Sequence, residues 1–354
     1  MYIKKLTEYD ILERLEPGKE LLSPLVVKRR QERLPGDTAD ARIDLAFRGG
    51  ETSYPFVVEV KTQSTPMAVH NAIAQVRSMV RDNEWPLLMV PYLSPERLAE
   101  LEKEQVSGVD LCGNGIVMVP NRITVMRTGY PNQYPESRPL NNPYRGRSAM
   151  VARMLLSRPR WESLKDLLEA IQQAGAKLSL PQASKAVQAL REDMMVSKGD
   201  GAIVLRDPLR LLDKLGAGWR KPRINGRKSL RLPNGLEFAQ VLSSNSLLQW
   251  AMTGAYSVKR YAVFAEGGPR RIAVSNLPLA ITLLGGIEEP VPNFGDLELI
   301  ETDEAGYFFE NETDEFGVRW ASPLQTWLEL QAGDARQQDA AKSLRSQILN
   351  KAQS

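Results

Sequence analysis

The first 130 residues alternate between short apolar runs and a segment with helically spaced apolar positions. Residues 42–63 predict two strands joined by a turn at Gly49-Gly50, because their apolar positions alternate or run on between turn residues. Residues 66–81 carry apolar side chains three and four positions apart, as a helix with one buried face does. Strands and helices that alternate in this way predict an α/β domain over residues 1–130, with helices on the faces of a sheet.

Three charged residues fall on the predicted hairpin of residues 42–63, with Asp44 on its first strand and Glu59 and Lys61 on its second. Side chains two positions apart on a strand point to the same face, so Glu59 and Lys61 share a face opposite Val58 and Val60. Carboxylates beside an ammonium suit a divalent metal such as Mg²⁺ and the activation of water. A solvated ion pair at a strand end is the alternative interpretation.

The strings IDLAF and VVEVK resemble the core of the PD-(D/E)XK, or restriction-endonuclease-like, nuclease superfamily. The resemblance implies that Asp44, Glu59 and Lys61 are catalytic and that the carboxylates hold Mg²⁺ or Mn²⁺. Asp40, in the string TADAR, is a rival for the position of Asp44 as catalytic residue and metal ligand. Gln75, on the next predicted helix, resembles a glutamine that many members carry there, although a solvated helix position explains it equally well.

Two further parts of the first segment bear on this interpretation. Thr7 is a candidate cap for a helix that runs to Glu16, and Glu13 on that helix is a further acidic candidate. The string PYLSPERLAELEKEQVSGVDLCGNGIVMV resembles a subgroup of bacterial and archaeal proteins in which a nuclease-like domain precedes a winged helix. Its D-x-x-G-N signature is matched by Asp110, Gly113 and Asn114, although a tight turn capped by Asp110 and Asn114 also explains these residues.

Composition excludes several classes of protein. A chain of 354 residues exceeds the usual span of one domain, so two or three are expected. One cysteine rules out a disulfide framework and an all-cysteine metal site, and one histidine leaves little for a His-rich zinc site. The apolar runs are too short to span a bilayer and the N-terminus lacks a signal-peptide core, so we expect a cytoplasmic protein without membrane contacts.

The net charge is only +3, but the basic and acidic residues are unevenly distributed along the chain. Residues 1–143 hold 18 basic and 19 acidic side chains, residues 144–231 hold 19 and 8, and residues 232–354 hold 9 and 16. A central segment with a net charge of +11 is typical of a module that binds a polyanion, and we expect this polyanion to be double-stranded DNA. Residues 131–144, rich in Pro and Asn, form the linker before it.

The order of elements predicted in residues 145–231 is that of a winged helix-turn-helix domain. Helices are expected at 147–156, 161–174 and 180–193, followed by a hairpin at 195–204. The third helix is the candidate for entry into the major groove. The DNA-binding candidates are Gln182, Lys185 and Gln188 on this helix, Lys198 on the hairpin, and Lys221, Arg223, Arg227 and Lys228 on a basic loop over residues 219–231.

The acidic segment 232–354 mixes predicted helices and strands. Helices are expected at 238–253, 277–284 and 334–351, a hairpin at 260–275, and strands at 297–300 and 306–309. Its string VRWASPLQTWLELQAGDARQQDAAKSLRSQIL resembles the C-terminal, nucleotidyltransferase-like α+β domain of abortive-infection type IV antitoxins. The active Gly-Ser and Asp-x-Asp pattern is missing near Gly254 and Asp296, so transferase activity is not expected.

Two functions follow, and both include DNA binding. The first is a transcriptional regulator, an antitoxin-like repressor with a nuclease-like domain, whose partners are DNA and a cognate toxin or other basic protein. The second is a Mg²⁺-dependent DNA endonuclease targeted by its winged helix. The sequence allows a homodimer in either case. DNA cleavage is the observation that separates the two functions, and the wider reach of the antitoxin resemblance favours the regulator.

Overall fold

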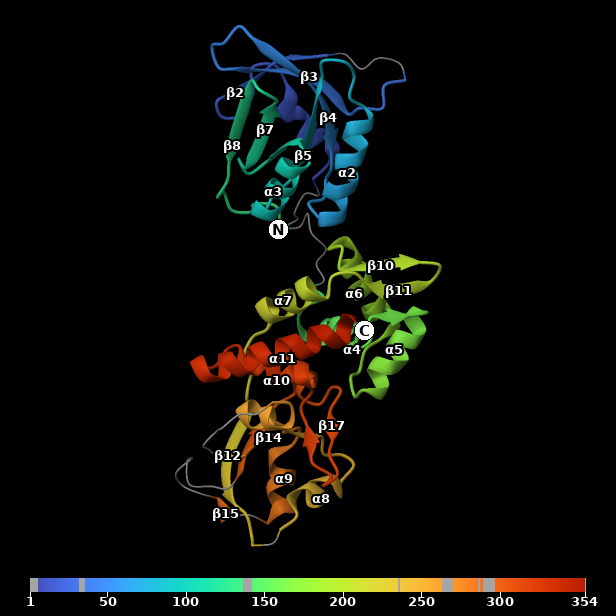
Figure 1. The fold of residues 1–354 in the computed structure, drawn as a ribbon, viewed down its shortest axis with the longest axis vertical. Coiled ribbons are helices and arrows are strands. Elements are labelled where there is room, and N and C mark those ends of the chain that lie inside the picture. The colour runs from blue at the N-terminus through green and yellow to red at the C-terminus, as the bar shows by residue number, and fades with distance from the viewer. Residues whose placement is uncertain are drawn as a thin grey trace. The chain divides into compact units, whose positions relative to one another are not determined.

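The computed structural model describes residues 6–31, 36–135, 142–234, 236–262, 270–285, 287–288 and 297–353 (Figure 1). The chain forms two compact units. The first consists of Met1–Leu140 with Glu192–Met194, and the second of Asn141–Arg191 with Met195–Ser354. Both units combine helices with β-sheets, so the protein is of mixed α/β class.

The first unit is built on an eight-stranded sheet whose strand order follows the chain from β1 to β8. Strand β5 is parallel to β4 and to β6, and the other neighbours are antiparallel. Its elements are α1 (Glu8–Leu12), β1 (Glu20–Leu22), β2 (Leu25–Arg30), β3 (Ala41–Phe47), β4 (Ser53–Val60), α2 (Pro66–Ser78), β5 (Trp85–Val90), α3 (Pro95–Lys103), β6 (Ser107–Asp110), β7 (Gly115–Val119) and β8 (Ile123–Arg127).

Two apolar clusters cover the two faces of this sheet. One face packs strand residues such as Ile43 and Val58 with Ile11 of α1. The other face packs Val57 and Leu88 with the buried stripe of α2, which consists of Val69, Ala72, Ile73 and Val76. The helical spacing in residues 66–78 therefore corresponds to a real buried stripe, and Figure 1 shows α2 and α3 beside the strands of the sheet.

Two local predictions in the first unit are confirmed. Thr7 caps α1 and forms a capping box with Asp10, and the helix continues as a 3₁₀ turn, Glu13–Leu15. The carboxylate of Asp110 accepts hydrogen bonds from the backbone N–H groups of Leu93, Cys112 and Asn114, at 2.7–2.9 Å, and from the Asn114 side chain at 2.7 Å. The D-x-x-G-N element is thus a capped turn between β6 and β7.

The second unit begins with helices and a small sheet. Its elements are α4 (Ala149–Ser157), β9 (Arg160–Trp161), α5 (Leu164–Gln173), α6 (Leu180–Glu192), β10 (Val196–Gly199), β11 (Ala202–Leu205) and α7 (Pro208–Gly218). The three strands are antiparallel in the order β10-β11-β9. Trp161 lies on β9 opposite Ile203, whereas the sequence pattern placed it in the following helix. Helix α7 was not predicted from the sequence, although Asp207 caps it and Leu211, Leu212 and Leu215 form its buried stripe.

A seven-stranded sheet follows, in the order β15-β12-β16-β14-β13-β18-β17. Its strands are β12 (Gly226–Arg231), β13 (Trp250–Thr253), β14 (Arg270–Val274), β15 (Ile287–Glu288), β16 (Leu297–Glu301), β17 (Glu312–Thr313) and β18 (Arg319–Trp320). The helices of this part are α8 (Phe238–Ser243), α9 (Leu277–Leu284), α10 (Pro323–Leu330) and α11 (Ala335–Gln353), with 3₁₀ turns at Gly254–Arg260 and Ala305–Tyr307.

Four predictions for residues 219–354 are wrong or only partly tested. Residues 226–231, expected in a loop, form β12, because they pair with β16. The helix expected at 238–253 ends at Ser243, where a polar run makes its own turn, and Trp250–Thr253 is a strand. Residues 305–307 form a 3₁₀ turn in place of the expected strand. The second half of the hairpin expected at 260–275 is strand β14, which pairs with β13 and β16. Residues 263–269, which include part of the first half, lie outside the described residues. So do residues 289–296, which include Asp296.

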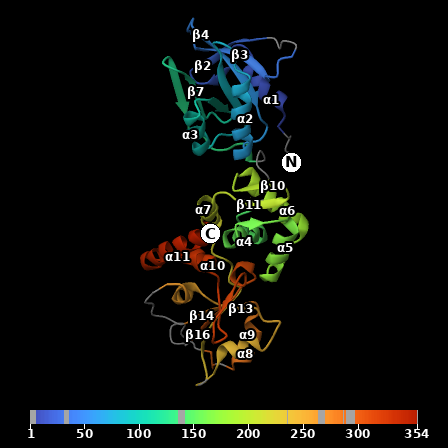
Figure 2. The same ribbon diagram turned by 45° about the vertical axis from the view of Figure 1, so that its right-hand side comes forward.

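One apolar cluster joins the helices on both sides of residue 231. It packs Val151 and Leu155 of α4 and Leu211 of α7 against Trp327 of α10 and Leu344 of α11. Figures 1 and 2 both show α11 alongside α10 and close to α4. The boundary expected at residue 231 therefore does not separate two hydrophobic cores.

Candidate functional site

Glu59 lies at the end of β4, on the face of the sheet that α2 covers. Its side chain is only 1% exposed, and its Oε2 has no hydrogen-bond partner among the described residues. A buried carboxylate oxygen without a partner costs free energy, so its presence here needs a reason beyond packing. One such reason is a ligand that reaches this oxygen.

Lys61 and Gln75 lie beside Glu59. The Lys61 ammonium donates a hydrogen bond to Oε1 of Glu59 and another, of 3.2 Å, to Oε1 of Gln75 on α2. The Lys61 backbone N–H bonds the carbonyl of Met89 at 2.9 Å, which holds this residue against β5 after β4 has ended. Three of the residues predicted from sequence are therefore brought together.

Asp40 joins this group, and Asp44 does not. Asp40 precedes β3, where its backbone N–H bonds the Val58 carbonyl at 3.2 Å and its Oδ2 accepts a 2.8 Å bond from the Val60 N–H. Asp44 instead lies opposite Pro55 on β4. Glu59 lies four positions after Pro55 on this strand, which is about 13 Å at the usual rise per residue. Of the two rivals, Asp40 has the geometry to act with Glu59.

Asp40 is held in place by a buried ion-pair cluster that the sequence does not predict. Arg42, 6% exposed, bonds Asp37 through Nε at 2.8 Å and the Met79 carbonyl at 3.1 Å, and it also pairs with Glu84. The hydrogen bond from Arg42 lowers the pKa of Asp37 to about 2. Both ends of the short segment that carries Asp40 are thereby fixed.

The electrostatics of Glu59 favour a positive partner. Burial raises the pKa of Glu59, Lys61 opposes this, and the charges of Asp40 and Glu8 raise the pKa further. Glu8 lies on α1, five residues from the Glu13 that the sequence suggested. The sequence gives only a weak indication of a role for Glu8, because acidic residues are common in the first turn of a helix, where they interact favourably with the helix dipole.

The donor set fits a hard cation. Asp40 and Glu59 offer carboxylate oxygens, which Mg²⁺ and Mn²⁺ prefer, and such ions keep several waters or substrate oxygens as their other ligands. In the described part of the chain, no group of three or more His, Cys, Asp or Glu side chains forms a preassembled metal cluster. A metal here would thus rest on two carboxylates and on displacement of Lys61 from Glu59.

An open hollow adjoins Asp40, whereas Glu59, Lys61 and Gln75 are not among the residues that line it. The hollow has a volume of about 440 Å³ and is bordered by Arg30, Asp37, Asp40 and Arg42. Lys28, Arg29 and Arg30 are exposed on β2, the strand next to β3. Of these three cations, Arg30 borders the hollow next to Asp40, and a cation beside a carboxylate site suits a phosphate backbone.

The predicted DNA-binding residues divide between two places in the second unit. Gln182, Lys185 and Gln188 are exposed on α6, and Lys198 is exposed on β10. Gln182 also accepts bonds of 3.0 Å from the N–H and hydroxyl of Ser179, so part of its role is to cap α6.

The four cations of the expected basic loop lie elsewhere. Lys221 and Arg223 are exposed in the segment after α7. Arg227 and Lys228 lie on β12, and Arg227 pairs with Glu298 of β16 at 3.2 Å. These two residues thus belong to the seven-stranded sheet and not to the surface of α6, because β12 pairs with the strands of that sheet.

Comparisons of the chain with protein-family models, with curated proteins and with solved structures give no match. None of the helices described is long and apolar enough to cross a membrane.

Proposed function

We propose that this protein binds double-stranded DNA and hydrolyses its phosphodiester bonds at Asp40, Glu59 and Lys61, with Mg²⁺ or Mn²⁺ as cofactor. The observation that carries the proposal is the convergence of Asp40, Glu59, Lys61 and Gln75, where Oε2 of the buried Glu59 has no hydrogen-bond partner in the part of the chain that the structure describes. The resemblance of VVEVK to PD-(D/E)XK nucleases supports the same chemistry.

Each side chain has a distinct role in this proposal. Asp40 and Glu59 would hold the cation, and the Val60 N–H keeps Asp40 in position. A bound divalent cation would polarise the phosphate and lower the pKa of a water molecule. Lys61, released from Glu59, would place its ammonium on the attacked phosphate or the attacking water. Gln75 accepts from Lys61 and is a positioning residue.

DNA binding rests on the second unit. The helices α4, α5 and α6 and the hairpin β10–β11 occur in the order of a winged helix-turn-helix. The exposed side chains of α6 recur at positions 182, 185 and 188, along one side of the helix, as residues that contact base edges do. The positive charge of residues 144–231 would supply affinity that does not depend on sequence.

A DNA-binding regulator of the antitoxin-like repressor type is the second candidate. It is favoured by the apolar core that α4, α6 and α7 share with α10 and α11, because a partner bound to the acidic segment 232–354 would then act on a core to which α6 also belongs. The partner we propose for this function is a basic protein such as a cognate toxin, and a homodimer stays a prediction. This function requires no cleavage.

The test is to incubate purified protein with supercoiled and linear DNA in the presence of Mg²⁺, Mn²⁺ or a chelator. The nuclease proposal expects DNA binding under all three conditions and cleavage only with a metal ion. Binding without cleavage under every condition would leave the regulator as the function. Absence of DNA binding at low salt would contradict both.

A further inference from the structure

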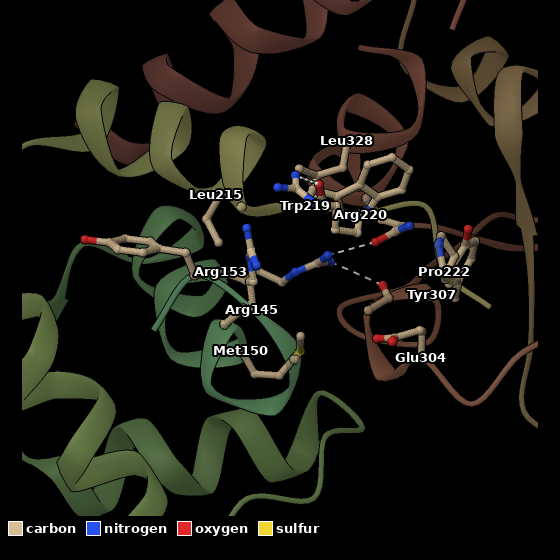
Figure 3. A pocket seen from close by; sticks show the side chains of 16 residues that line it. Arg145, Met150, Arg153, Leu215, Trp219, Arg220, Pro222, Glu304, Tyr307 and Leu328 are labelled. Carbon is tan, nitrogen blue, oxygen red and sulfur yellow. Dashed lines mark hydrogen bonds between the residues drawn. The ribbon is translucent and has the colours of Figure 1, made fainter. Parts of the chain in front are cut away.

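A small cavity of about 220 Å³ lies within the second unit, where three arginines meet (Figure 3). Arg145 precedes α4, Arg153 lies on α4, and Arg220 follows α7. The cavity is also lined by Trp219, Leu328 of α10 and one carboxylate, that of Glu304. Its charge and its walls are unlike those of the Asp40–Glu59 site, and the proposed function does not use it.

Among the described residues, no carboxylate contacts the buried guanidinium of Arg153 directly, although the charges of Glu310, Glu304 and Glu329 act on it from a distance and raise its pKa. Arg153 is 5% exposed, and it donates to the Gly306 carbonyl at 3.3 Å and to Oε1 of Gln325 at 2.9 Å. Both acceptors are neutral, Nε has no partner, and no carboxylate of the described residues forms an ion pair with it. Burial lowers the pKa of Arg153 to about 10, so the guanidinium is still protonated at neutral pH.

The fold is adapted to this arginine. A Cβ at Gly306 would lie 2.8 Å from Nη2 of Arg153, so the absence of a side chain at this position lets the guanidinium approach the backbone. A buried ion whose counter-charges act only at a distance is costly, since the attraction of neutral dipoles replaces only part of its lost hydration. An anion in the cavity would offset this cost.

Arg145 and Arg220 add to the positive charge of the same hollow. Both are exposed, and Arg220 bonds the carbonyls of Ala217 and Trp219 at 3.1 and 2.9 Å. The cavity lining holds three guanidinium groups and one carboxylate, that of Glu304, so an anion among the guanidinium groups would lower their mutual repulsion. Guanidinium groups bind carboxylate and phosphate oxygens through paired hydrogen bonds.

We propose that this cavity binds a small organic anion. Its carboxylate or phosphate group would lie among Arg145, Arg153 and Arg220, and its apolar part would lie against Trp219 and Leu328. The volume is below the range of ordinary ligand sites, which begins at about 300 Å³, so the ligand is about the size of a substituted benzene ring with one acidic group.

The experiment measures binding to the full chain by calorimetry with four probes: phenyl phosphate, benzoate, inorganic phosphate and benzyl alcohol. We expect saturable 1:1 binding of phenyl phosphate, benzoate or both, with inorganic phosphate and the neutral alcohol at least about tenfold weaker. Arg145→Gln and Arg220→Gln should each weaken binding of the aromatic anion about tenfold or more, because each removes a charge-assisted hydrogen bond. Arg336→Gln, an exposed residue of α11 outside the cavity lining, is the matched control.

Arg153→Gln is the sharpest variant and also the one at risk of misfolding. Its readout is therefore the shift of its melting temperature by the aromatic anion, which should be present in the wild type and lost in the variant. The proposal is overturned if neither aromatic anion binds at about 10 mM, or if the Arg145 and Arg220 variants bind as tightly as the Arg336 variant. It is also overturned if benzyl alcohol or inorganic phosphate binds as tightly as the aromatic anions.

Discussion

The carboxylate of Asp40 accepts a 2.8 Å hydrogen bond from the backbone N–H of Val60, the residue after Glu59. This bond crosses from the segment before β3 to the end of β4 and sets two carboxylates side by side. The mutual repulsion of the two charges is one reason why the pKa of Glu59 is raised. The proposed chemistry follows from this relationship, and several measurements test it.

The first prediction separates Asp40 from Asp44. Asp40→Asn should reduce metal-dependent cleavage by at least about a hundredfold, since it removes one of two charged metal ligands, whereas Asp44→Asn should retain most of the activity. Initial rates on a supercoiled plasmid with Mn²⁺ check this. A nuclease that tolerates Asp40→Asn and loses activity with Asp44→Asn would place the metal at the other end of β3.

The second prediction concerns the stability of the protein without metal. The raised pKa of Glu59 means that its ionisation opposes folding, so its contribution to stability is fully present below the ordinary glutamate pKa of about 4.3 and is lost as pH rises through the raised value. Glu59→Gln should therefore raise the melting temperature in a chelator at pH 7–8, and the gain should vanish near pH 4. Added Mg²⁺ should stabilise the wild type more than the variant. A variant less stable than the wild type at pH 8 would contradict this account.

The third prediction concerns the salt dependence of DNA binding. Lys185→Ala and Lys198→Ala should each reduce the slope of log affinity against log salt concentration by about 0.9, because each lost phosphate contact releases fewer counterions. Arg227→Ala should leave the slope unchanged, since Arg227 is paired with Glu298 on the seven-stranded sheet. Fluorescence anisotropy with a labelled duplex between 50 and 200 mM salt measures all three, and a slope altered only by Arg227→Ala would move the DNA surface to β12.

The fourth prediction tests the shared core of the second unit. Leu344 on α11 is fully buried, and Leu344→Ala should lower the free energy of unfolding by about 2–5 kcal/mol. Leu247→Ala, at a side chain that is 83% exposed, is the matched control and should change it by less than about 0.5 kcal/mol. Urea unfolding followed by circular dichroism provides the measurement. Equal effects of the two substitutions would show that α11 does not stabilise this unit.

The sequence predicted the elements whose pattern is local. The stripe of α2, the capping box at Thr7 and the turn at Asp110 follow from spacing and from side chains that bond their own backbone. The choice between Asp40 and Asp44 could not be made in this way. The two residues are an even number of positions apart on one extended segment, so the alternation of side chains does not distinguish them. It depends on the register that places Ala41 opposite Val58.

Other features depend on packing between distant residues. Trp250–Thr253 has the composition of a helix or a strand, and its place between β14 and β18 decides for the strand. The buried guanidinium of Arg153 could not be recognised from sequence either. It is apparent only when Gly306 and Gln325, more than 150 residues away, are seen to supply neutral acceptors.

The most direct test of the central claim is the cleavage of supercoiled plasmid by three proteins, the wild type, Glu59→Gln and Glu51→Gln, in Mn²⁺ and in a chelator. Glu51 is an exposed residue of the turn between β3 and β4, so its substitution controls for the loss of one negative charge. We predict metal-dependent cleavage by the wild type and Glu51→Gln, and none by Glu59→Gln, which should still bind DNA. Cleavage by Glu59→Gln at the wild-type rate, or no cleavage by the wild type, would contradict the account.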